Sequence, residues 1–142
     1  MNLDTKNTDG YTPLLYAVEE RKASLVRELL QYPDRIDING QSYMGNTALQ
    51  LACMKNLPDI VQLLLDAGCN INIRNNLGFN AFHIACLSAD TDIVRIFIRR
   101  KDNFDINSTD NAGNNAFHLA LEQNHVEVVR LLLEAGIHTI SN

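Results

Sequence analysis

One spacing recurs four times along the chain, and it limits the possible folds more than any other feature. In each copy a glycine is followed seven residues later by an alanine, and a valine stands nine residues beyond that alanine. The sets are Gly10, Ala17 and Val26; Gly45, Ala52 and Val61; Gly78, Ala85 and Val94; and Gly113, Ala120 and Val129. Neighbouring glycines lie 33 or 35 residues apart, and self-similarity at such a period indicates structural units that stack on one another.

Each copy carries the pattern of two short amphipathic helices. A threonine or asparagine after the glycine offers an acceptor for the first amides of a helix, in the pairs Thr12-Pro13, Thr47-Ala48, Asn80-Ala81 and Asn115-Ala116. Apolar residues then recur at three- and four-residue intervals, as in Phe82, Ala85 and Cys86. A second stripe follows a polar turn, as in Ile60, Val61 and Leu64. Helices this short are marginal in isolation, so each pair needs neighbours that cover its apolar faces.

The four copies resemble ankyrin repeats. The family pattern G-x-T-P-L-H-x-A appears as GYTPLLYA, GNTALQLA, GFNAFHIA and GNNAFHLA, and LLLDAGCNIN and LLLEAGIHTI close the second and fourth copies. The resemblance covers residues 7 to about 140, with copies at about 7–39, 42–72, 75–107 and 110–142. It implies an all-α ankyrin-repeat solenoid of four helix-turn-helix repeats joined by β-hairpin-like loops, forming a single domain over residues 1–142.

Two details of this pattern carry structural expectations. The repeated AFHxA segment predicts close helix approach at the alanine, a phenylalanine that fills the layer between repeats, and a local hydrogen bond from His83 or His118. The glycine that the family has between its two helices is replaced by Arg21, Asn56, Ala89 and Asn124. Asparagine tolerates left-handed backbone, whereas Arg21 and Ala89 predict either a different turn or backbone strain.

The titratable side chains do not form a recognisable reaction centre. Some are spaced like metal ligands, namely His83, Asp90 and Asp92, and His118, Glu122 and His125. However, His83 and His118 hold equivalent places in adjacent repeats, and packed helices lie about 8–10 Å apart. Cys86 with His83 could be a nucleophile and its base, but Cys53 occupies the same place without a histidine. We therefore expect packing roles, no enzyme activity, no metal and no cofactor.

Composition excludes further classes of function. The net charge is −5 and the isoelectric point is about 5.2, whereas nucleic-acid binding needs a basic face. No apolar run approaches the length of a membrane span. The three cysteines are too few for a disulfide framework and indicate reduced thiols. We expect no nucleic acid, no membrane and a cytoplasmic location, or the host cytosol or nucleus if the protein is an effector.

The resemblance implies that a partner binds the concave surface formed by the hairpin tips and the first helices. In repeats two and three the residues expected there are largely apolar, whereas repeats one and four contribute mainly acidic and amide side chains. We therefore expect a helix or extended peptide with an apolar centre and basic flanks. Alternatively, Met44 and Leu77 fold over the neighbouring hairpin and Leu87 lies under the next helix, which would close the stack. The candidate partner-binding residues are Tyr11, Glu19, Glu20, Tyr43, Met44, Asn46, Met54, Leu77, Phe79, Leu87, Asn111, Asn114 and Glu122.

The two ends of the repeat array differ. Glu28 occupies the place of Leu63, Ile96 and Leu131, so repeat one is expected to be a starting cap. Repeat four keeps the internal pattern, and the last residues, HTISN, stand where another hairpin would begin. We expect either that the natural protein continues beyond residue 142, of which this chain would be the N-terminal part, or that this end packs on a partner or self-associates with a second copy.

Three classes of function remain. The first is a non-catalytic protein–protein interaction module. The second is the targeting or substrate-recruiting arm of a larger enzyme or of a bacterial or viral effector whose catalytic domain lies outside this chain. The third is a structural solenoid in a self-assembling array. The resemblance also implies asparagine hydroxylation by a dioxygenase at the ends of the DIN and NIN turns, best matched by Asn72; alternatively, the Asn72 side chain ties the hairpin together.

Overall fold

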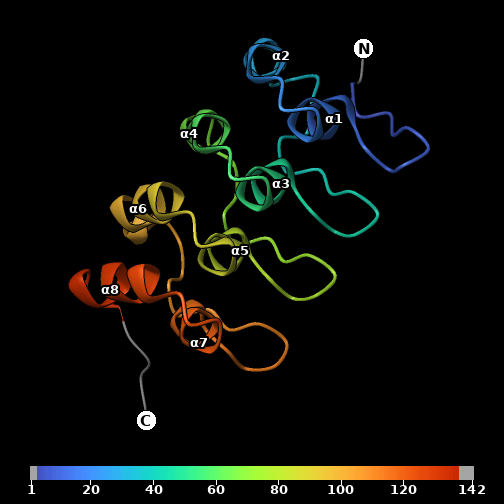
Figure 1. The fold of residues 1–142 in the computed structure, drawn as a ribbon. Coiled ribbons are helices and arrows are strands. Elements are labelled where there is room, and N and C mark those ends of the chain that lie inside the picture. Colours follow the sequence, from blue (N-terminus) through green and yellow to red (C-terminus); the bar gives the residue numbers. More distant parts are fainter. Residues whose placement is uncertain (1–2, 138–142) are drawn as a thin grey trace.

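The computed structural model describes residues 3–137, and within this range the chain forms eight α-helices in four consecutive pairs. Figure 1 shows the pairs side by side in one row, so the expected all-α solenoid is confirmed. Each pair makes its main tertiary contacts with the pair before and after it. The pairs are α1 (Pro13–Glu19) with α2 (Ala23–Leu29), α3 (Ala48–Met54) with α4 (Pro58–Asp66), α5 (Ala81–Ser88) with α6 (Thr91–Arg99), and α7 (Ala116–Glu122) with α8 (Val126–Glu134).

The predicted caps start the first helix of every repeat. The side chains of Thr12 and Thr47 accept backbone N–H bonds at 3.3 and 3.2 Å, and those of Asn80 and Asn115 do so at 2.8 and 2.9 Å. In repeats two to four, Gln50, His83 and His118 return a bond from the third helical position to the backbone N–H of the cap residue. This reciprocal arrangement satisfies two amide donors that the helix itself leaves unpaired.

One residue in the turn between the two helices has the same backbone conformation in all four repeats. Arg21, Asn56, Ala89 and Asn124 all take left-handed backbone, with φ between 57° and 61°. The strain expected at Arg21 and Ala89 is therefore present, and at Ala89 the turn also differs, because α5 continues to Ser88 and the Ala89 N–H bonds to the Ala85 carbonyl. A residue with a Cβ atom is strained in this conformation by about 1–2 kcal/mol. The packing of the two helices sets the backbone conformation at this position, which is the same for arginine, asparagine and alanine.

The core runs through the row of pairs as layers between neighbouring repeats. The repeated alanines Ala17, Ala52, Ala85 and Ala120 are fully buried, as the close approach of helices requires. Phe82 and Phe117 fill the layers as expected, with exposed fractions of 1% and 7%. In repeat three, Phe82, Phe97 and Phe104 form a cluster with ring centroids 5.2 to 5.9 Å apart. Burying one large apolar side chain of this kind contributes about 1.5–3 kcal/mol.

The two longer loops absorb the two extra residues of repeats one and three. In repeat three the insertion forms a short 3-10 helix, η1 (Lys101–Asn103), directly after α6. In repeat one the corresponding segment forms turns at the end of α2. Both insertions lie outside the helix layers, so they change the spacing in sequence without disturbing the stack.

Hairpin-like loops precede the first helix of each repeat and all project from the same side of the row (Figure 1). Each loop contains two backbone hydrogen bonds of 2.8 to 3.1 Å, for example from Ser42 N–H to Asn46 C=O and from Gly45 N–H to Ser42 C=O, although no residue between 3 and 137 is in a strand. The tip glycines Gly10, Gly45, Gly78 and Gly113 have φ of 81° to 86°. Glycine takes this conformation without steric cost, which explains its recurrence at the tips.

Candidate functional site

A polar residue three positions before each tip glycine folds the tip. Asn75 Oδ1 accepts the N–H groups of Leu77 at 2.9 Å and Phe79 at 3.1 Å, and Asp110 Oδ1 likewise accepts those of Ala112 and Asn114. Asn7 makes the same pair of bonds in repeat one, and Ser42 makes one of them in repeat two. This position was not predicted from the sequence, although the recurrence of a small polar residue before the glycine was a usable signal.

The tips of repeats one to three each rest on the tip of the next repeat. A Cβ atom built on Gly10 would lie 2.5 Å from the ring of Tyr43, and one on Gly45 would lie 2.7 Å from the backbone nitrogen of Asn76. A Cβ atom on Gly78 would overlap the side chain of Asn111. Only glycine leaves enough space for this close approach. The tips therefore form one continuous edge, which we call the tip edge, instead of four independent loops.

The tips of repeats two and three are also joined by hydrogen bonds. Asn76 donates its backbone N–H to the Met44 carbonyl at 3.0 Å and its side-chain amide to the Tyr43 carbonyl at 2.9 Å. Asn75 Nδ2 donates to Asn46 Oδ1 at 2.9 Å. Asn46 is half-buried, and its side-chain oxygen accepts this bond from the neighbouring repeat. These three bonds hold the two middle tips as one rigid unit.

Three apolar side chains stand out from this rigid unit. Tyr43, Met44 and Leu77 have exposed fractions of 64%, 61% and 63%, the largest among the exposed apolar residues of the described chain. We call these three residues the tip patch. Met44 and Leu77 are mainly in solvent, whereas the Tyr43 ring covers Gly10 of the neighbouring hairpin, as the closure alternative describes. The Lys6 ammonium lies 5.6 Å from the centre of the Tyr43 ring, which places one positive charge beside the patch.

The remaining apolar candidates lie deeper along the first helices. Met54, at the end of α3, is 39% exposed. Phe79 is half-buried with its ring edge against His83, and the ring centroids are 6.2 Å apart. Leu87 is half-buried in α5, and its carbonyl accepts a bond from His125 Nε2 at 2.9 Å. Phe79 and Leu87 thus contribute to packing and present only part of their surface.

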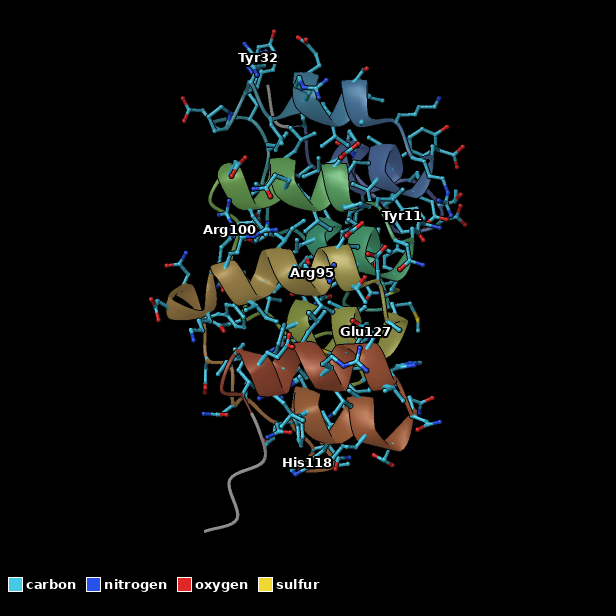
Figure 2. All side chains as sticks on the ribbon, turned by 60° about the vertical axis from the view of Figure 1, so that its left-hand side comes forward. Tyr11, Tyr32, Arg95, Arg100, His118 and Glu127 are labelled. Atoms are coloured by element: carbon cyan, nitrogen blue, oxygen red, sulfur yellow. The ribbon has the colours of Figure 1, made fainter. Side chains whose placement is uncertain are left out.

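Repeat one forms the acidic end of the candidate site. Tyr11, labelled in Figure 2, donates its hydroxyl to Glu19 at 3.2 Å, and Lys55 from repeat two pairs with the same carboxylate at 2.9 Å. Burial, followed by the charge of Glu19, raises the pKa of Tyr11 above its ordinary value. Glu20 is exposed. A depression of about 480 Å³ is lined by Asn7, Asp9, Tyr11, Tyr16, Glu19 and Glu20.

Repeat four forms the other end of the site. Asn111 and Glu122 are exposed, whereas Asn114 is half-buried, and its N–H and C=O both bond to Asp110. The predicted positions therefore lie on the hairpin tips and along the first helices of the four repeats. It also adds Lys55, which neutralises part of the acidic end through its ion pair with Glu19.

His83, Cys53 and Cys86 are buried in the core. His83 Nδ1 accepts the Asn80 N–H at 3.1 Å, and its Nε2 donates to the Ser108 carbonyl at 2.7 Å. Burial lowers the pKa of His83. Burial also raises the pKa of the Cys53 and Cys86 thiols well above the usual range, and that of Cys69 to about 12. Such thiols are protonated at neutral pH and are poor nucleophiles.

The described residues contain no group of three or more histidine, cysteine or acidic side chains that could hold a metal ion. None of the helices in the described range is long and apolar enough to cross a membrane. Asn72 is exposed, and its Oδ1 accepts the Asp105 N–H at 3.4 Å, as Asn39 Oδ1 accepts the Asn70 N–H at 2.8 Å. The Asn72 side chain thus has a structural role, although it bonds to the loop of the next repeat and not within its own hairpin as the alternative expected.

A family model for ankyrin repeats matches the chain over residues 1–75 and 68–142, so the chain belongs to the ankyrin repeat family. Members of this family generally serve as protein–protein interaction modules. An ankyrin repeat protein of Rickettsia bellii is 32% identical over 104 residues, which cover 72% of this chain and 15% of that protein. An ankyrin repeat protein of fowlpox virus is 34% identical over 108 residues, 75% of this chain and 31% of that protein.

Similar segments also occur in proteins named for catalytic activities. Serine/threonine-protein kinase 12 of Arabidopsis thaliana is 29% identical over 93 residues, which cover 66% of this chain and 20% of the kinase. This chain spans less than a third of each of these three relatives.

Proposed function

We propose that this chain is a non-catalytic interaction module that binds a partner protein through the tip edge and the first helices. The tip patch carries the proposal. Tyr43, Met44 and Leu77 are more than half exposed, yet they stand on a unit held by hydrogen bonds. Exposed apolar side chains on a pre-organised surface lose little entropy on binding, and they mark interfaces more often than chance does.

The distribution of charge supports a particular kind of partner. Asp9 and Glu20 are exposed at the end formed by repeat one, and Glu122 is exposed in repeat four. A helix or extended peptide with an apolar centre and basic flanks would place its apolar side chains on the tip patch and its Lys or Arg residues near these carboxylates. Such complementarity raises the association rate and fixes the orientation of the peptide.

A displayed library of random peptides tests this proposal, because the selection does not require that the partner be identified first. We expect peptides enriched on the chain to carry apolar residues between Lys or Arg residues. The double variant Met44→Ser/Leu77→Ser should weaken their binding by about 10- to 100-fold, the scale of interface hot spots. Its melting temperature should stay nearly unchanged, because both side chains are mainly in solvent.

Leu25→Ser is the matched control, because Leu25 is an exposed leucine on α2 with an exposed fraction of 39%. This variant should bind the selected peptides as the unmodified chain does. Equal binding by the double variant and the unmodified chain would contradict the assignment of the tip patch. A large loss of stability with binding intact would assign Met44 and Leu77 to packing instead.

A second function is that of a targeting or substrate-recruiting arm of a larger enzyme or effector. The support is that similar segments form parts of longer proteins, including the kinase. Mass spectrometry of the native protein, purified with an antibody against this chain, tests this second function, which predicts peptides from a catalytic domain.

The same spectra test hydroxylation of Asn72, which stays a prediction.

We further propose a reducing, cytosolic location, supported by three free cysteines of which two are buried.

A further inference from the structure

The C-terminal face of repeat four exposes residues whose equivalents in the earlier repeats are buried or half-buried. Leu121 is 49% exposed, whereas Val18, Cys53 and Cys86 at the same repeat position are fully buried. Leu133 is 53% exposed, whereas Leu65 at its position in repeat two is 6% exposed. Val129 is half-buried, although the other valines of its series are fully buried. We call Leu121, Val129, Leu133 and Gly113 the end face.

The tip of repeat four is also uncovered. In repeats one to three, the residue two positions before the next tip glycine covers the glycine: Tyr43 covers Gly10, Asn76 covers Gly45 and Asn111 covers Gly78. Gly113 has the same backbone conformation, with φ of 86°, but a Cβ atom built on it would meet no described atom within 4 Å. The helix face and the tip of repeat four are thus both uncovered at positions that the following repeat contacts in repeats one to three.

We propose that the end face is the docking surface for a further ankyrin-type repeat of the same polypeptide, stacked as repeat four stacks on repeat three. Repeat four shows what such a unit needs. On its side toward repeat three it places Leu119 and Val128, with exposed fractions of 6% and 0%. The incoming repeat presents apolar side chains at these two positions and a tip residue over Gly113. Figure 2 shows His118, from α7, at this end of the molecule.

A second copy of the chain is a poorer occupant. The face that repeat one would offer carries Tyr16 and Leu25 at the positions of Leu119 and Val128, and they are 42% and 39% exposed. It also carries Glu28, which is exposed, where the internal repeats have Leu63 and Ile96. Head-to-tail stacking would bring the Glu28 carboxylate against the apolar end face, and burying an unpaired charge is costly.

The test extends the chain with one of its own repeats. A copy of residues 69–107 is joined after Gly136, in the register in which it follows Gly68. We expect the melting temperature to rise by about 5 °C or more, because one more interface is buried. In the control, the grafted copy carries Ile84→Glu and Ile93→Glu, which place charges at the two docking positions. The control graft should give no rise.

Leu121→Gln tests the end face from the side of the chain itself, without any change in the sequence of the grafted repeat. This substitution should leave the melting temperature of the unextended chain within about 1 °C and lower that of the extended chain by about 3 °C or more. Light scattering should show the unextended chain as a monomer, and the native protein should be heavier than 15.9 kDa. No stabilisation by the graft, a dimer that Leu121→Gln dissociates, or a native mass of 15.9 kDa would each overturn the proposal.

Discussion

At the level of single residues, Gln50 and His83 make equivalent hydrogen bonds with different functional groups. Gln50 Oε1 accepts the Thr47 N–H at 3.0 Å, and its Nε2 donates to the Ile73 carbonyl at 2.7 Å. His83 makes the equivalent bonds to Asn80 and Ser108. The Gln50 amide and the neutral His83 imidazole each offer an acceptor on one atom and a donor on another, and Gln50 Nε2 uses its second N–H to donate to the Phe79 carbonyl at 3.3 Å. Each therefore caps its own helix and holds the loop of the next repeat.

The difference between the two side chains predicts a pH dependence. Protonated His83 would turn its Nδ1 acceptor into a donor facing the Asn80 N–H, and burial lowers its pKa. The unfolded chain therefore takes up this proton more readily. The free energy of unfolding should be unaffected by His83 above a pH of about 6.5 and should fall as the pH decreases from there toward the lowered pKa of the folded state.

Urea denaturation at a series of pH values measures this effect. His83→Gln should keep both hydrogen bonds, as Gln50 does, and should remove the His83 contribution to the slope below a pH of about 6.5. An identical pH dependence in the variant and the unmodified chain would show that His83 carries a proton equally well in the folded and unfolded states.

Ala89 offers a second residue-scale prediction, because its φ of 61° strains a residue with a Cβ atom. Ala89→Gly should relieve about 1–2 kcal/mol of strain, against about 0.4–1 kcal/mol of added entropy in the unfolded chain. We expect a net stabilisation of about 0.5–1 kcal/mol in chemical denaturation. Asn56→Gly should gain less, since asparagine tolerates this conformation. A loss of stability in Ala89→Gly would show that packing of the Ala89 methyl group contributes more to stability than relief of the backbone strain does.

At the level of elements, substitutions in the hairpin tips separate the effect of local backbone strain from the effect of contact between neighbouring repeats. Gly45 and Gly113 have φ of 81° and 86°, so an alanine meets the same backbone strain at both. Only at Gly45 would its Cβ atom lie 2.7 Å from backbone of the next tip. The two glycines are thus a matched pair in which only the neighbouring repeat differs.

We expect Gly113→Ala to cost about 0.5–1 kcal/mol in the free energy of unfolding, which is the backbone strain less the entropy that the alanine removes from the unfolded chain. Gly45→Ala should cost about 1–3 kcal/mol more, because the tip edge must separate to accept the methyl group. Equal losses in urea denaturation would mean that the tips move independently and that the tip edge is not a rigid unit.

The element scale also shows what the sequence could and could not predict. The caps at Thr12 and Asn80 were predictable, because capping depends on residues three positions apart. The exposure of Met44 and Leu77 was not, since a side chain beside a tip can point outward or fold over the next hairpin. The Glu19–Lys55 pair was also missed, because it joins two repeats and depends on how the helices are offset.

At the level of the whole molecule, a period near 33 residues determined the fold because each pair can bury its apolar faces only against an equivalent pair. Ala17, Ala52, Ala85 and Ala120 were identified by their spacing, and all are fully buried. Function does not follow from periodicity in the same way. The tip patch consists of side chains that differ between repeats, so only the surface on which it lies follows from the repeat.

We propose above all that a partner binds the flank made by the tips and the first helices. Chemical-shift mapping on the isotope-labelled chain, titrated with a selected peptide, measures this most directly. We predict that shifted amides will cluster at residues 43–46 and 76–79 and extend along α3 and α5. Shifts confined to the outer helices α2, α4, α6 and α8 would contradict the proposal.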